Sequence, residues 1–207
     1  MSITIRLTGG VSMERCGWVT EDQVYLDYHD HEWGRPMKDD RELFELLCLE
    51  GAQAGLSWLT ILKRRKQYKE AFDQFDPSTI AGYSDEKIEE LLQNEGIIRN
   101  RLKIRSVVKN AKAYQAVVEQ YGSFSSYIWS FVDNQPIINH WTCLSEVPSQ
   151  TEESRMMSRE MKKDGFSFVG PTICYAYMQS AGLVNDHLTG CFCYQEVNQL
   201  IEKGEFR

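Results

Sequence analysis

Apolar residues recur every three or four positions through most of the chain, and alternation of apolar with polar residues is almost absent. This spacing is typical of amphipathic helices rather than strands. Asp39 or Asp40 is a suitable N-cap for a helix that continues to about Ala52, and a second helix is expected over 58–72 after the interruption at Gly55. Further helices are expected to begin at Ser84 (ending before Gly96), after a very short connection beyond it, and at Ser123, Thr151 (ending at Gly165) and Pro171 (ending near Gly182). The pattern predicts an all-α fold, a bundle of short helices, with residues 134–150 as a loop.

Charge is distributed unevenly along the chain. The net charge is −7, yet residues 96–118 contain six basic and no acidic side chains. Arg101, Arg105, Lys109 and Lys112 fall on one stripe of a helix, opposite an apolar stripe. Such a stripe is consistent with a phosphate-binding surface, although without further signals an ordinary solvated helix face is the simpler interpretation. The same two interpretations apply to a second basic run at 63–69.

Two pairs of soft-metal ligands lie near opposite ends of the chain: Cys16 with His29, and His187 with Cys191. Two thiolates and two imidazoles complete the tetrahedral shell of a structural Zn²⁺ ion and leave no position open for water. The HxxxC spacing of His187 and Cys191 predicts that both lie on one face of a helical turn. The alternative is that the cysteines are simply buried apolar side chains.

Length and cysteine usage limit the class of protein. The 207 residues fit one large domain or two small ones. The N-terminus lacks the basic segment followed by an apolar segment that is typical of a secretion signal. No apolar run approaches the roughly 20 residues that span a bilayer. The six cysteines are therefore expected to stay reduced in the cytoplasm, with no membrane partner. Cys48, Cys143 and Cys174 are expected to be core thiols.

Aromatic residues gather in the first third of the chain, where Trp18, Tyr25, Tyr28 and Trp58 accompany Glu50. Aromatic faces beside a carboxylate are suited to a planar, electron-poor ring. Each aromatic residue taken alone is equally consistent with an ordinary core position. Glu50 follows an apolar helix face, which favours a partly buried carboxylate with a specific partner.

Several long blocks resemble the DNA-3-methyladenine glycosylase I family. They are MERCGW from Met13, YHDHEWG from Tyr28, LEGAQAGLSW from Leu49, GIIRNRLKI from Gly96, FVGPTICYAYMQSAGLVNDH from Phe168, and the closing GCFCY. The resemblance covers 13–194 and leaves 1–12 as an N-terminal extension and 195–207 as a C-terminal tail. It implies a helix-hairpin-helix DNA glycosylase fold, with that element at about 85–115.

The resemblance also implies a set of site residues. The family's metal ligands fall on Cys16, His29, His187 and Cys191, as one structural Zn²⁺ per chain that joins the N- and C-terminal segments. Its base pocket falls on Trp18, Tyr25, Tyr28, Glu50 and Trp58, and its DNA-probing wedge on Gly55 and Leu56. Its hairpin falls on 94–98, and the expected DNA contacts there are Gly96, Arg99, Arg101 and Lys103. The usual hairpin has a second glycine where this chain has Ile98.

The implied reaction is release of 3-methyladenine from double-stranded DNA after base flipping, which leaves an abasic site. Glu50 is expected to accept hydrogen bonds from the flipped base. No hairpin lysine is placed for a lyase step, and the residues do not identify a general base, although Asp133 and Asp186 are acidic residues to inspect. A monomer is expected. A DNA-damage binding protein without catalysis and a zinc-stapled interaction domain are the alternative classes.

Overall fold

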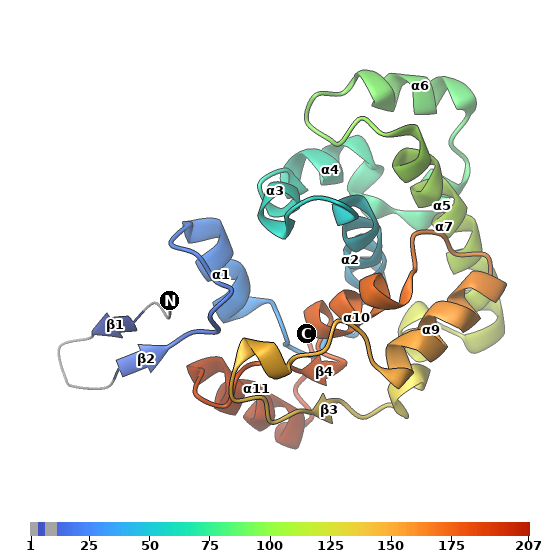
Figure 1. Ribbon diagram of the computed structural model, residues 1–207. Coiled ribbons are helices and arrows are strands. Elements are labelled where there is room, and N and C mark those ends of the chain that lie inside the picture. The colour runs from blue at the N-terminus through green and yellow to red at the C-terminus, as the bar shows by residue number, and fades with distance from the viewer. Residues whose placement is uncertain (1–3, 7–11) are drawn as a thin grey trace. The chain divides into compact units, whose positions relative to one another are not determined.

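The structure, a computed structural model, describes residues 4–6 and 12–207. These residues are mostly helical, with eleven α-helices and four short strands, which confirms the all-α prediction (Figure 1). They divide into two compact units. The first unit comprises the described residues up to 38 together with 135–149 and 178–207, and the second comprises 39–134 and 150–177. Within the described part of the chain, no helix is both long enough and apolar enough to cross a bilayer.

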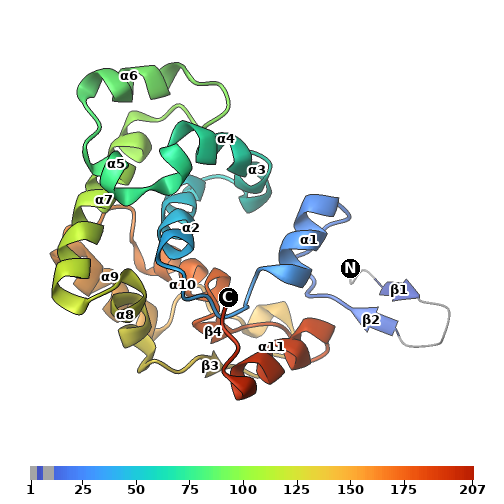
Figure 2. The same cartoon turned by 180° about the vertical axis from the view of Figure 1, so that it is seen from behind.

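The second unit is built around one long helix, α7 (Arg101–Tyr121), whose apolar stripe is buried. Its other elements are α2 (Asp40–Gln53), α3 (Trp58–Leu62), α4 (Arg65–Ala71), η1 (Asp73–Phe75), α5 (Pro77–Ala81), α6 (Asp85–Gln93), α8 (Phe124–Trp129), η2 (Ser130–Val132), α9 (Glu152–Lys163) and most of α10 (Pro171–Ser180). Helices α2, α5, α6 and α8 all pack against α7. α8 lies beside the C-terminal half of α7 (Figure 2).

Side-chain caps set the starts of the helices in the second unit. Asp39, Ser84, Ser123 and Thr151 each accept a hydrogen bond from a backbone N–H in the first turn of the helix that follows, and Pro171 is the first residue of α10. These starts confirm the predictions made from capping residues, because a cap is a contact between residues only two or three positions apart.

The helix predicted over 58–72 is wrong, since the chain breaks it into α3 and α4. Arg64 leaves the helical conformation, with φ −106° and ψ 0°. The break directs α4 towards α2, where Arg65 Nε and Lys69 Nζ lie 2.6 and 3.0 Å from the carboxylate of buried Glu45. A buried carboxylate requires such partners, and the ion pairs with Glu45 outweigh the local preference for one continuous helix.

The first unit contains the short strands. Its elements are β1 (Thr4–Arg6), β2 (Ser12–Glu14), α1 (Gln23–His31), β3 (Ile137–Ile138), η3 (Leu144–Glu146), β4 (Val184–Asn185), α11 (Phe192–Lys203) and the end of α10. β1 pairs antiparallel with β2, so residues 4–6 of the expected loose extension form a strand, while 1–3 and 7–11 lie outside the described residues. β3 pairs in parallel with β4, and most of the remaining 134–150 segment is irregular, as predicted. Helices α1 and α11 were not predicted.

Gly182 allows two segments of the first unit to approach closely. Its φ is +71°, and a Cβ atom there would lie 2.4 Å from the backbone of Arg35 and Pro36. Nearby, the N–H of Met37 donates to the carbonyl of Ala181 at 3.0 Å. Only glycine tolerates both this conformation and this contact. The close approach fixes the chain between α1 and α2 against the turn that leads into β4.

Candidate functional site

Four predicted metal ligands meet in the first unit. Cys16 follows β2, His29 lies in α1, His187 follows β4, and Cys191 precedes α11; all four are buried. Their ligand atoms lie within 4.8 Å of one another. Cys16 Sγ is 3.6 Å from His187 Nδ1, while Cys191 Sγ is 3.5 Å from His29 Nε2 and 3.8 Å from His187 Nδ1. The cluster joins the N- and C-terminal segments of the chain, as predicted.

These spacings suit a tetrahedral metal ion. Metal–sulfur and metal–nitrogen bonds of roughly 2.3 and 2.05 Å at tetrahedral angles place sulfur and nitrogen about 3.6 Å apart. The observed sulfur–nitrogen distances of 3.5–3.8 Å agree with that value. Two thiols and two imidazoles buried at these distances form the donor set that a soft divalent metal requires. The buried Cys2His2 cluster therefore suggests a metal site.

The outward nitrogen of each imidazole has its own hydrogen-bond acceptor. His29 Nδ1 donates to Asp30 Oδ1 at 2.8 Å, and His187 Nε2 donates to the Trp33 carbonyl at 3.0 Å. Arg15 in turn donates to the Asp30 carboxylate at 2.8 and 2.6 Å. This assignment of tautomers leaves an unprotonated nitrogen on each ring facing the sulfur atoms, as metal ligation requires.

The ionisation of the surrounding groups favours a cation. Burial by itself raises the pKa of Asp30, but hydrogen bonds from Arg15 and His29 outweigh it and hold that pKa below its ordinary value of 3.8. Hydrogen bonds from Cys16 and Cys193 lower the pKa of the Cys191 thiol, and the same contacts raise the pKa values of Cys16 and Cys193, so the charge lies on Cys191. The Cys191 thiolate inside the cluster and the Asp30 carboxylate, hydrogen-bonded to the outer nitrogen of His29, both stabilise a bound positive charge.

The predicted helical turn at His187 and Cys191 is wrong. Both residues lie outside α11, and Cys191 donates its backbone N–H to the Leu188 carbonyl at 2.8 Å in a turn. The turn itself brings both side chains to the cluster. Cys193 contacts the opposite edge of the His29 ring, with Sγ 3.9 Å from Nδ1. It therefore groups with His29 and Asp30 rather than with the four inner ligand atoms.

Two of the other three cysteines are core thiols and the third is not. Cys48 and Cys174 are buried, as predicted. Cys143 is exposed, which contradicts the prediction. It lies just before the short helix η3 in the irregular 134–150 segment, where its Sγ is 3.1 Å from Ser145 Oγ. The physical reason is that this segment contributes few apolar side chains to a core.

The aromatic residues predicted to bind a base lie partly in the first unit. Trp18 is half-buried, and its ring centroid lies 5.1 Å from that of Tyr25 and 5.2 Å from that of His29. Tyr28 is buried and donates its hydroxyl hydrogen to Ser180 Oγ at 3.0 Å. Trp18 thus connects the metal cluster to Tyr25 through ring contacts.

Glu50 and Trp58 lie in the second unit, on either side of the turn between α2 and α3. Glu50 is only 2% exposed, so a carboxylate is held within the apolar part of α2. Trp58 begins α3 and is half-buried. Between them, Gly55 has a φ of +78°, and Leu56 is 40% exposed at the tip of the turn.

The hairpin predicted at 94–98 is held by side chains from two sides. Asn94 Oδ1 accepts a hydrogen bond from the Gly96 N–H at 2.8 Å, and the Tyr68 hydroxyl accepts one from the Ile98 N–H at 3.1 Å. A Cβ atom on Gly96 would lie 2.9 Å from Cβ of Gln67, so the hairpin approaches α4 closely. At the position where the usual hairpin has its second glycine, the Ile98 N–H is thus bonded to a side chain of α4.

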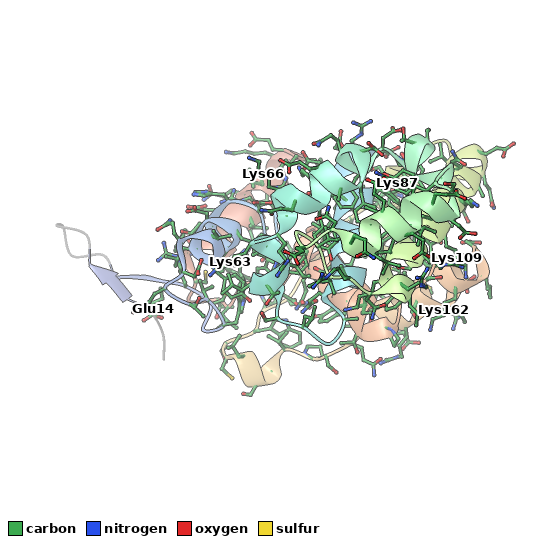
Figure 3. All side chains as sticks on the ribbon, turned by 90° about the horizontal axis from the view of Figure 1, so that it is seen from above. Glu14, Lys63, Lys66, Lys87, Lys109 and Lys162 are labelled. Atoms are coloured by element: carbon green, nitrogen blue, oxygen red, sulfur yellow. The ribbon has the colours of Figure 1, made fainter. Side chains whose placement is uncertain are left out.

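The basic stripe of α7 faces solvent. Arg101 and Arg105 pair with Glu89 and Asp85 of α6, with Arg105 Nη2 2.9 Å from its partner. Arg99, in the hairpin-to-helix connection, is about half exposed and lies 3.5 Å from Glu95. Figure 3 labels Lys109 of the stripe, and also Lys66 of the second basic run, which is exposed. Lys103 differs, because its ammonium group donates to two backbone carbonyls of the second unit.

Neither inspected acidic residue stands out as a general base. Asp186 is buried and accepts hydrogen bonds from Asn139, Trp141 and Gln179 at 2.6, 2.9 and 2.7 Å. Asp133 is exposed in a left-handed conformation at the end of η2. Sequence reasoning missed Arg15 and Asp30 as supports of the cluster; the signal available was a carboxylate directly after a ligand histidine.

Comparisons with known proteins agree with this geometry. The sequence profile of the methyladenine glycosylase family matches residues 18–194. DNA-3-methyladenine glycosylase 1 of Escherichia coli (strain K12) is 52% identical over 182 residues, which cover 88% of this chain and 97% of that enzyme.

Solved structures show the same similarity in three dimensions. A crystal structure of 3-methyladenine DNA glycosylase I superimposes with a TM-score of 0.84 at 54% identity, covering 86% of this chain and 98% of that one. A single-residue variant of such an enzyme in complex with 3-methyladenine also gives a TM-score of 0.84, at 38% identity, covering 86% and 96%. The match extends through both units, which confirms the resemblance seen in the sequence: the chain belongs to the methyladenine glycosylase family.

Proposed function

We propose that this protein hydrolyses the N-glycosidic bond of 3-methyladenine in DNA and releases the free base, leaving an abasic site. The observation that carries the proposal is the identity of 52% over 97% of the E. coli enzyme, so nearly that enzyme's whole length has a counterpart here. The substrate is double-stranded DNA with an alkylated base, and 3-methyladenine is the product. We place the protein in the cytoplasm as a monomer.

The metal that suits the cluster is one structural Zn²⁺ ion per chain. Cys16, His29, His187 and Cys191 would hold it, and four protein ligands leave no position open for a reacting water. Its contribution is therefore to folding, because it ties the segment around α1 to the segment before α11. Asp30 and the Trp33 carbonyl orient the two imidazoles for this purpose.

Base recognition is assigned to a carboxylate and aromatic rings. The nucleoside of 3-methyladenine is cationic, so its base is a good leaving group, and the protein contributes mainly by recognising and stabilising charge. Glu50, buried on α2, faces the N6 and N7 edge of the flipped base and accepts a hydrogen bond from its N6 amino group. Trp18, Tyr25, Tyr28 and Trp58 provide stacking surface and shape. The depth at which Glu50 is buried supports this role, because a buried carboxylate interacts strongly with a positively charged ring.

DNA binding is assigned to the hairpin and to the turn before α3. The hairpin at Gly96 lies along the DNA backbone, and Arg99 and Arg101 contact phosphates. Exposed Leu56, at the tip of the Gly55 turn, enters the base stack beside the damaged nucleotide. No lysine of the hairpin is placed as a nucleophile, so the reaction ends at hydrolysis without strand cleavage.

The test is release of 3-methyladenine from methylated duplex DNA by the parent, by Glu50→Gln and by Glu42→Gln. Glu42 lies in the first turn of the same helix and is the matched control. We expect release by the parent and the control, and a loss of about 100-fold or more in Glu50→Gln, as when a charge-stabilising group is removed. Binding of methylated duplex without release would place the protein among damage-binding proteins. Equal rates for all three would refute the role of Glu50.

A further inference from the structure

Lys103 is the one predicted DNA contact whose charged group is directed into the protein's own backbone. Its Nζ donates to the carbonyl of Ala52 at 2.8 Å and to that of Ala54 at 2.6 Å. These carbonyls belong to the last turn of α2 and to its C-cap. The last carbonyls of a helix lack intrahelical partners, and a cation there satisfies them and complements the helix dipole.

The turn that Lys103 contacts carries Leu56. Gly55 adopts a φ of +78°, with nothing within 4 Å of the Cβ position, so the turn is open to solvent on that side. Its local bonds run from the Ala54 N–H to Gly51 at 3.4 Å and from the Leu56 N–H to Gln53 at 2.6 Å. Both bonds connect neighbours in sequence. The Lys103 ammonium adds a connection to a residue about fifty positions away, on α7.

Lys103 is itself held firmly at the start of α7. Its backbone N–H donates to Asn100 Oδ1 at 3.1 Å, and its carbonyl accepts from Ser106 Oγ at 2.6 Å. Burial lowers the pKa of the Lys103 ammonium, whereas Arg99 and Arg101 are about half exposed. The hairpin that binds phosphate in our proposal ends immediately before this turn of α7. One side chain therefore links the phosphate-binding element to the exposed apolar tip.

We infer that Lys103 is a positioning residue: it fixes the 54–56 turn on α7, so that Leu56 is presented at a constant position relative to the hairpin. The inference rests on the proposed function and replaces the expectation that Lys103 is a phosphate ligand. A phosphate ligand acts on every duplex and independently of Leu56. A positioning residue acts through Leu56 alone.

A double-mutant cycle tests this difference. The activity of Lys103→Met, Leu56→Ala and the double variant is measured as kcat/KM for release of 3-methyladenine from methylated duplex DNA. We expect Lys103→Met to lower kcat/KM on the order of 10- to 100-fold in the parent background, because a small misplacement of a substrate-positioning group has an effect of this size. In the Leu56→Ala background the same change is expected to lose less than about twofold, because residues that act as a unit are not additive.

Arg99→Met is the matched control for a phosphate contact. It is expected to lose activity equally in both backgrounds and to reduce the slope of log binding constant against log salt by about 0.9. Lys103→Met is expected to leave that slope unchanged. Equal losses for Lys103→Met in both backgrounds, or a slope reduced like that of Arg99→Met, would overturn the inference. If Lys103→Met does not fold, Lys103→Ala, which also removes the donor to both carbonyls, takes its place.

The failure of this inference differs from that of the proposed function. A parent protein that releases no base contradicts the proposed function itself. A parent that releases base while the cycle is additive contradicts the role of Lys103 alone.

Discussion

Removal of the Asp30 side chain should weaken the metal site without touching a ligand. In Asp30→Ala, His29 Nδ1 loses the acceptor that lies 2.8 Å away and orients the ring. Loss of such a supporting group typically weakens metal affinity 10- to 100-fold, which is about 1.4–2.7 kcal/mol. Because the metal binds only the folded chain, the same amount is lost from the free energy of unfolding of the metal-loaded protein at saturating metal.

A second contribution comes from Arg15, whose side chain is only 10% exposed. Without Asp30 it loses its charge-assisted hydrogen bonds at 2.8 and 2.6 Å. An unsatisfied buried donor costs about 1–3 kcal/mol, and this loss affects the metal-free protein as well. Asp30→Asn retains an acceptor for His29, so we expect less than a tenfold loss of metal affinity in that variant.

Two measurements separate the contributions. Competition for Zn²⁺ with a chromophoric chelator gives the dissociation constant, and urea unfolding with and without excess chelator gives the free energy of unfolding in each state. Asp27→Ala, an acidic residue on the same helix that accepts from Gln23, is the matched control and should bind metal like the parent. If Asp30→Ala bound Zn²⁺ as tightly as Asp27→Ala, the supporting role of Asp30 would be refuted.

Three further changes test the fold and the hairpin. Tyr68→Phe removes the acceptor of the Ile98 N–H at 3.1 Å, and we expect a loss of about 1–3 kcal/mol in urea unfolding together with weaker binding of duplex in a gel-shift titration. Asp76→Ala removes the N-cap of α5 and should cost about 1 kcal/mol at neutral pH. Hydrogen bonds lower the pKa of Asp76 in the folded protein, so its stabilisation is present above its ordinary pKa of 3.8; the difference between parent and variant should shrink as unfolding is measured at progressively lower pH. Gly182→Ala should lower the free energy of unfolding by more than about 2 kcal/mol, because the new Cβ atom lies 2.4 Å from backbone atoms and φ is unfavourable for alanine. Gly204→Ala is the control, with φ +66° and no close neighbour, and should lower it by only about 1 kcal/mol in the same urea unfolding assay.

Local signals in the sequence predicted much of the second unit. Ser84 and Thr151 were recognised as helix starts because a capping side chain bonds an N–H two or three residues later. The same reasoning failed for the 58–72 segment. There, Arg65 and Lys69 pair with Glu45 on a different helix, and the pattern of apolar residues in the segment does not indicate that contact.

The residue types of the metal cluster were also readable, since Cys16, His29, His187 and Cys191 form a complete ligand set by chemistry alone. The sequence did not show that the turn at Leu188, rather than a helix, brings the last two ligands together. An HxxxC spacing is compatible with both. Only the packing of the chain between β4 and α11 determines that the two ligands lie in a turn and not in a helix.

The sequence by itself determined the helical class, most helix starts in the second unit, the ligand types and the family to which the chain belongs. Those features depend on contacts between near neighbours or on the identity of side chains. The tertiary structure alone decided that Asp30 supports His29 with help from Arg15, and that Lys103 turns from solvent to the carbonyls of Ala52 and Ala54. The physical reason is that a charged side chain takes the partner that burial brings within hydrogen-bonding distance, and burial is set by segments far apart in the chain.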